Sequence, residues 1–116
     1  MLTISPETFS RMNAVEEDRF VRKLVGFLKT SVPSLANEPP ADIYAQARLL
    51  TQKARSYGMT SEQAVAAFAL TAAQLGLDFV ERFAGVRQIL FSSHSEDEKA
   101  KLLEGFTISL FQTLAR

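Results

Sequence analysis

The stretch from Tyr57 to Gln63 constrains the fold most, because it ends one helix and begins another within a few residues. Gly58 has no Cβ, so it can take the left-handed backbone conformation that closes a helix. Thr60 has a hydroxyl that can accept a hydrogen bond from a free amide of the next helix, and Gln63 follows as in a capping box. The stretch therefore predicts a sharp helix–turn–helix corner in the middle of the chain.

Two helices are predicted before this corner. The first begins with Ser5 as a hydroxyl cap and Pro6 at the first helical position. It ends before Pro33, which cannot continue the hydrogen-bond ladder. Apolar residues recur at helical spacing from Phe20 onward, whereas residues 16–19 are all charged. Either the first two turns of this helix therefore project from the core, or the helix is interrupted at these residues. We expect one continuous helix.

The second helix is predicted from Pro40 or Ala41 to Tyr57. It follows a loop at residues 32–40 that holds all but one of the prolines. Its apolar residues recur at the spacing of a single helix face. They are Ile43, Ala47, Leu50, Ala54 and Tyr57.

The third helix is predicted from Thr60 or Ser61 to Leu75, where Gly76 ends it. Its apolar face comprises Val65, Phe68, Ala69, Ala72 and Leu75. The helix is also rich in alanine, and small side chains let neighbouring helices approach closely. We therefore place this helix at the centre of the fold, packed on more than one side.

The segment after Gly76 is predicted to be less regular. Residues 77–83 are expected to form one or two helical turns, and Gly85 then interrupts them. Residues 86–91 are expected to form another short helical piece, followed by a serine-rich loop. No alternating pattern typical of strands competes with this interpretation.

The last helix is predicted from its cap, Ser95, to Leu114, with Glu98 completing a second capping box. Its main apolar stripe is Leu102, Phe106, Leu110 and Leu114, while Leu103, Ile108 and Phe111 lie off that stripe. A terminal helix that is apolar on two sides is either deeply inserted or offers one side to a partner. Together the elements predict an all-α compact bundle of four main helices plus one or two short helical turns, in a single domain of residues 1–116.

The composition favours a folded protein of the cytoplasm. Hydrophobic residues make up 47% of the 116 residues, and the absence of cysteine excludes disulfides and thiolate sites. No apolar run reaches the ~20 residues of a membrane helix, and the N-terminus lacks the pattern of a secretory signal. We therefore expect no membrane contact. The 13 basic and 13 acidic residues give zero net charge, which removes self-repulsion and allows a homodimer.

No pattern of catalytic or metal-binding residues is visible. His94 is the only histidine, and a catalytic or metal site would need further groups at fixed spacing, so we interpret it as a solvated loop residue. The acidic run at residues 96–98 fits the positive end of a helix dipole. The charged segment at residues 16–23 is interpreted as a solvated helix face with ion pairs such as Asp18–Arg22; the alternative is a charged docking surface. We expect no enzyme, no metal and no cofactor.

A nucleic-acid partner is not expected either. The helix that begins at Thr60 contains no Arg or Lys, although contacts to phosphates depend on such side chains. A transcriptional regulator would need a basic face that only folding could assemble. Its candidate residues are Arg48, Lys53, Arg55, and Arg82 or Arg87.

The segment Ala54–Val65, with Tyr57-Gly58-Met59-Thr60 and Glu62 inside it, resembles a family of small bacterial proteins. These proteins are encoded beside type VI secretion effectors and their spike-tip (PAAR) proteins. Further matches are Phe68 and the run Leu75-Gly76-Leu77-Asp78-Phe79. The resemblance covers most of the chain, and most of the matching residues are structural.

The resemblance extends to both ends of the chain. Phe20 and Leu24 match a long N-terminal helix that carries an aromatic residue, and Ile89-Leu90 and Lys101-Leu102 match a segment that leads to a capped last helix. The proline usual in front of Ile89-Leu90 is replaced by Gly85-Val86, which leaves the path of residues 79–91 open. The resemblance implies an adaptor or co-chaperone, without catalytic residues, that holds an effector or its loading chaperone.

The sequence therefore predicts a non-enzymatic protein-interaction module. Its contact surface is expected on the long first helix with its charged segment, or on the outer face of the last helix, because exposed Phe and Met suit a partner groove. The candidate contact residues are Phe9, Met12, Arg19, Arg22, Phe111 and Leu114. An alternative is an immunity-type protein that blocks a toxin with an acidic patch.

Overall fold

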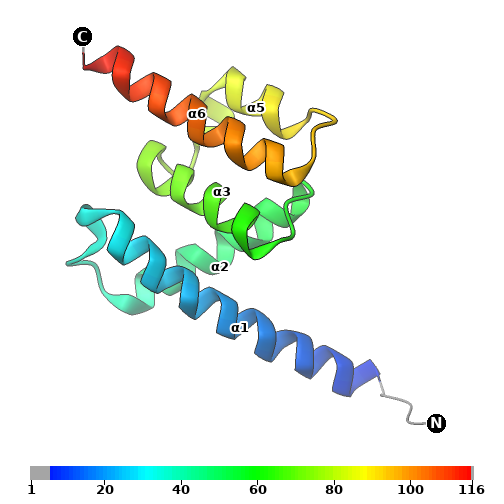
Figure 1. Ribbon diagram of the computed structural model, residues 1–116. Coiled ribbons are helices and arrows are strands. Elements are labelled where there is room, and N and C mark those ends of the chain that lie inside the picture. Colours follow the sequence, from blue (N-terminus) through cyan, green and yellow to red (C-terminus); the bar gives the residue numbers. More distant parts are fainter. Residues whose placement is uncertain (1–5, 116) are drawn as a thin grey trace.

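The computed structural model describes residues 6–115, and side chains from Val15 to Ala115 (Figure 1). All regular elements in this part of the chain are helical. The long helices are α1 (Pro6–Ser31), α2 (Pro40–Ser56), α3 (Glu62–Leu75) and α6 (Glu96–Leu114), and the short ones are η1 (Pro33–Leu35), α4 (Phe79–Arg82) and α5 (Ala84–Leu90). The all-α bundle of four main helices is therefore confirmed.

Helix α3 lies at the centre of the fold, as its alanine content predicts. It contacts α1, α2, α4 and α6, and α1 and α6 lie on opposite sides of it (Figure 1). Its predicted apolar face is confirmed, because the following residues are all buried: Val65, Phe68, Ala69, Ala72 and Leu75. Phe68 forms the aromatic centre of the core, with its ring centroid 5.0 Å from that of Phe79.

The corner between α2 and α3 forms, but its cap differs from the prediction. Gly58 has a φ of 82°, as a left-handed helix terminator requires. The cap of α3 is Ser61, whose hydroxyl accepts a hydrogen bond from the Ala64 amide at 3.1 Å. The predicted Thr60 cap is wrong because α3 begins one residue later than that cap requires. Gln63 is then the second residue of the helix and cannot complete the capping box.

The segment after α3 also differs from the prediction at one glycine. Gly76, with a φ of 110°, ends α3 as expected. Gly85 does not interrupt a helix but lies inside α5. A Cβ at this position would lie 2.8 Å from the Phe106 ring, so this glycine lets α5 pack closely on α6. The short helix α5 therefore supports one flank of α6, while α4 contacts α3 and α5.

The predicted apolar stripe of α6 is only partly buried. Leu102 is 41% exposed and Leu114 is 71% exposed, whereas the buried residues are Ala100, Leu103 and Thr107. Successive residues of the stripe are four positions apart, so each side chain points about 40° further around the helix axis than the one before it. Phe106 and Leu110, in the middle of the stripe, therefore pack partly buried against the core, whereas both ends of the stripe, Leu102 and Leu114, are exposed.

Helix α1 is continuous over 26 residues, so the interrupted alternative does not apply. It packs on the body through Val21, Leu24 and Leu28, and it ends before Pro33 as predicted. Its N-terminal half and the C-terminal end of α6 project from the body at opposite corners (Figure 1). The predicted cap Ser5 lies outside the described residues.

Candidate protein-interaction surface

The most unusual surface belongs to residues 105–115, the distal segment of α6, which carry no charged residue. Ile108, Phe111 and Leu114 follow one another at intervals of three residues in this segment. They are 50%, 45% and 71% exposed, respectively. Surfaces of small soluble domains usually carry charges on roughly a quarter of their residues or more, so three turns of uncharged exposed helix are atypical.

Leu114 is exposed because the helix on which α6 rests ends too early to cover it. Helices α3 and α6 begin beside each other, where the Ser61 amide donates to Glu96 Oε1 at 2.7 Å. They run in the same direction, but α3 has 14 residues and α6 has 19. The last turn of α6 therefore extends beyond α3 (Figure 1), and Leu114 lacks the neighbours that bury Leu103.

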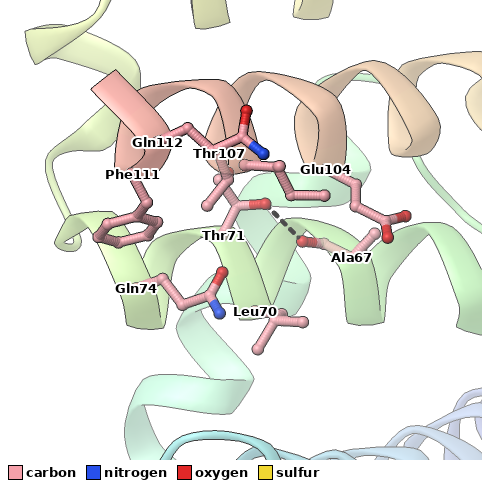
Figure 2. Close-up of a pocket in the computed structure, with 9 residues that line it drawn as sticks. Ala67, Leu70, Thr71, Gln74, Glu104, Thr107, Phe111 and Gln112 are labelled. Carbon is pink, nitrogen blue, oxygen red and sulfur yellow. Dashed lines mark hydrogen bonds between the residues drawn. The ribbon is translucent and has the colours of Figure 1, made fainter. Parts of the chain in front are cut away.

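A groove with a volume of about 410 Å³ lies beside the distal segment, between α3 and α6 (Figure 2). Its lining residues are Ala67, Leu70, Thr71, Gln74, Glu104, Thr107, Ile108, Phe111 and Gln112. The Thr71 hydroxyl donates to the Ala67 carbonyl at 2.8 Å, and the Thr107 hydroxyl donates to the Leu103 carbonyl at 2.9 Å. Both hydroxyls donate to their own helices. The groove is mainly apolar, with Gln74 and Gln112 as further polar side chains and Glu104 as its one charged residue.

The carboxylate of Glu96 sets the alignment of α3 and α6, and hence the position of the groove. It accepts hydrogen bonds from the Ser61 amide and, at 3.1 Å, from the Thr60 hydroxyl. These hydrogen bonds, those from Ser61 first, hold the pKa of Glu96 below its ordinary value. The Lys99 ammonium also donates to the Tyr57 carbonyl at 3.3 Å. The corner at residues 57–61 is thus tied to the first turn of α6.

The charged segment of α1, residues 16–23, has a different character, because each of its charges has a partner within the chain. Its ion pairs are Arg19–Glu16 at 3.8 Å, Arg22–Asp18 at 2.8 Å, Arg55–Glu17 at 3.0 Å and Lys23–Glu62 at 3.7 Å. The Tyr44 hydroxyl also donates to Asp18. This bond lowers the pKa of Asp18 and raises that of Tyr44. The segment therefore ties α1 to α2 and α3.

The predicted contact residues fall into two separate groups. Arg19 and Arg22 lie on α1 and are ion-paired, whereas Phe111 and Leu114 lie on the distal segment of α6. The side chains of Phe9 and Met12 lie outside the described residues. Sequence reasoning missed Ile108 and Leu70 as members of the same surface. The sequence signal for Ile108 is the uncharged run from residue 105 to residue 115.

Other candidate sites are occupied by contacts within the chain. His94 Nδ1 lies 2.8 Å from Glu98 Oε2 on the surface. The basic face that a DNA-binding regulator would need is largely engaged. Arg82 donates to the Leu75 carbonyl, Arg87 donates to the carbonyls of Val80 and Glu81, and Arg55 pairs with Glu17. Among the described residues, no three His, Asp or Glu side chains are grouped so that they could hold a metal ion.

Comparison with known proteins gives no relative from which a role could be transferred. No family model matches the chain, and neither does any curated protein or solved structure. Within residues 6–115, none of the helices is long and apolar enough to cross a bilayer. The distal segment of α6 and its groove are therefore the main basis for a functional hypothesis.

Proposed function

We propose that the protein is a non-enzymatic interaction module that binds another protein through the distal segment of α6 and the adjoining groove on α3. One observation carries this proposal. Residues 105–115 expose Ile108, Phe111 and Leu114 beside an apolar groove and carry no charge. Contiguous apolar surface of this kind marks sites that a partner covers.

The chemistry of the groove indicates the kind of partner. Its walls are two helices, and its lining includes Ala67, where the small side chain allows close approach of a backbone. Amphipathic helices bind in such grooves with large apolar residues as anchors. Phe111 is the best candidate for an energetic centre, because aromatic residues dominate the energy of protein interfaces.

The positions of the titratable groups support a non-enzymatic role. Asp18, Tyr44 and Glu96 have shifted pKa values. Each is engaged in a hydrogen bond between helices or loops of the fold. None of the three lines the groove, where Glu104 is the one carboxylate. An active site commonly places perturbed groups together in a pocket. Asp18 and Tyr44 do share a pocket, between α1 and α2, but there they are hydrogen-bonded to each other, and Asp18 is also paired with Arg22.

The resemblance of the region from Tyr57 to Phe79 to small type VI secretion proteins suggests the partner. On that basis we propose an adaptor or co-chaperone role, with a secretion effector or its loading chaperone bound at the distal segment.

The test is partner capture from the native host with matched variants. Phe111→Glu places a charge in the proposed interface, and Leu102→Glu makes the same change on the other flank of α6. The two side chains are similarly exposed, at 45% and 41%. We expect the wild type and Leu102→Glu to capture an effector or its chaperone, identified by mass spectrometry, and Phe111→Glu to lose it.

Several outcomes would overturn the proposal. Equal capture of the partner by both variants would show that another surface binds it. Capture of a nuclease or lipase toxin as the main partner would favour the immunity-type alternative. Recovery of nucleic acid alone would contradict both protein-binding roles.

A further inference from the structure

We infer that a second copy of this chain covers the distal segment of α6 in the free protein, with the two α6 helices antiparallel. The inference rests on the proposed function, because it names an occupant of the same surface. It also adds a resting state, since the second copy would have to leave before another protein could bind there.

The charge distribution favours a second copy. In a two-fold symmetric dimer the same patch of both chains meets itself, so a charge near the axis faces an identical charge. Residues 105–115 carry no charge that could be opposed in this way, and the charged residues that flank them in the sequence, Glu104 and Arg116, are opposite in sign. In an antiparallel pair centred on Phe111, the Glu104 residues of the two copies lie about 21 Å apart along the helices. This separation is about twice the distance over which salt screens exposed charges. The zero net charge of the chain adds no long-range repulsion.

The shape of the surface also favours a two-fold arrangement. A self-complementary patch needs a protruding part and a receiving part next to each other. Leu114 protrudes beyond the end of α3, and the groove lined by Ile108 and Leu70 begins beside it. Centring the pair on Phe111 places Leu114 of each copy opposite Ile108 of the other. Each copy thereby supplies the neighbours that Leu114 lacks within its own chain.

The same features argue against a strongly charged occupant. An acidic or basic peptide would find a single charged residue, Glu104, along the groove. Its remaining charges would lose water without gaining a partner, which is unfavourable. A second copy brings an equally uncharged surface and avoids this cost.

The first experiment measures the mass of the full chain by light scattering and sedimentation over a concentration series. We expect a reversible dimer. Phe111→Glu should raise the dissociation constant by about 30-fold or more, the effect of losing one interface hot spot. Leu102→Glu should leave the constant within about two-fold of the wild-type value. Unchanged circular dichroism and thermal midpoints would show that both variants fold.

A second measurement tests the register and does not depend on a charged substitution. The chain contains no cysteine, so Ile108→Cys and Leu114→Cys each carry one thiol. Under oxidation, a mixture of these two variants should form a disulfide-linked dimer faster than a mixture of Leu102→Cys and Leu114→Cys. Equal rates in the two mixtures would contradict the antiparallel pairing centred on Phe111.

The possible outcomes separate this inference from the proposed function. A wild type that stays monomeric at every concentration overturns the inference, while the proposed function stands if partner capture still depends on Phe111. A dimer that Phe111→Glu does not weaken also overturns it, because the interface then lies elsewhere. A dimer that Phe111→Glu disrupts, with partner capture unaffected, supports the inference and overturns the proposed function.

Discussion

The charged segment of α1 and the distal segment of α6 occupy similar positions but differ in what the fold does with them. Both lie on long helices that extend past the body at opposite corners (Figure 1). The charges at residues 16–23 are paired within the chain and connect α1 to α2 and α3. Ile108, Phe111 and Leu114 of the distal segment have no such cover. A conspicuous run of charges is therefore a weaker indicator of a binding surface than apolar residues that the fold leaves uncovered.

The largest expected effect compares two leucines on the same helix. Leu103 is fully buried and Leu114 is 71% exposed. Leu103→Ala should lower the free energy of unfolding by about 2–5 kcal/mol through the cavity it leaves. Leu114→Ala should change it by less than about 0.5 kcal/mol in dilute solution. Urea unfolding of both variants measures this contrast, and similar losses would mean that Leu114 is part of the core.

An intermediate effect on stability is expected from Glu96, whose carboxylate aligns α3 and α6. The folded state lowers the pKa of Glu96, so the unfolded chain binds a proton at this group at a higher pH than the folded chain does. The stability it contributes is then complete above the ordinary pKa of glutamate and is lost as the pH falls through the lowered value. Glu96→Gln should therefore reduce the acid sensitivity of the thermal midpoint.

Asp97→Asn provides the control for this pH dependence, because it removes a charge from the same first turn of α6. We expect its thermal midpoint to keep the wild-type acid sensitivity between neutral and acidic pH. If Glu96→Gln and Asp97→Asn behave alike, the effect comes from the helix terminus in general. The tie between Glu96 and the corner at residues 57–61 would then not explain it.

The smallest effect is expected in the charged segment of α1. The pairs Arg19–Glu16 and Arg22–Asp18 lie on the surface, and such pairs contribute about 0–1 kcal/mol. Arg19→Gln and Arg22→Gln should therefore change stability little, and the dissociation constant of the dimer should stay within about two-fold of the wild-type value. Light scattering would detect a larger shift, which would place the binding surface on α1.

The parts of the fold that depend on local patterns could be predicted from the sequence. The buried faces of α2 and α3 follow from single apolar stripes, and Gly58 and Gly76 end their helices as their freedom at positive φ indicates. The α3 cap was misplaced by one residue because Thr60 and Ser61 both carry hydroxyls. The sequence does not show which residues of α6 are buried, because that helix has two apolar rows and only the position of α3 decides between them.

The candidate site depends on features that are not local. The uncharged run at residues 105–115 is visible in the sequence, yet its exposure follows from where α3 ends. The contact between Glu96 and Ser61, which fixes that relation, joins residues far apart in the chain. Gly85 has the sequence signature of a helix breaker, and its role inside α5 depends on the ring of Phe106, which lies on a different helix. Local patterns do not specify the packing between helices. That packing decides the exposure of residues 105–115, the contact between Glu96 and Ser61, and the role of Gly85.

The central claim, that a protein partner covers the distal segment of α6, can be tested directly with one fluorescent residue. The chain contains no tryptophan, so Phe111→Trp introduces a single probe at the centre of the surface, and Leu102→Trp is its control. We predict that the emission of Phe111→Trp moves to shorter wavelength when the protein is concentrated or bound to its captured partner, while that of Leu102→Trp stays unchanged. Emission of Phe111→Trp that stays at the wavelength of a solvent-exposed tryptophan under both conditions would contradict the claim.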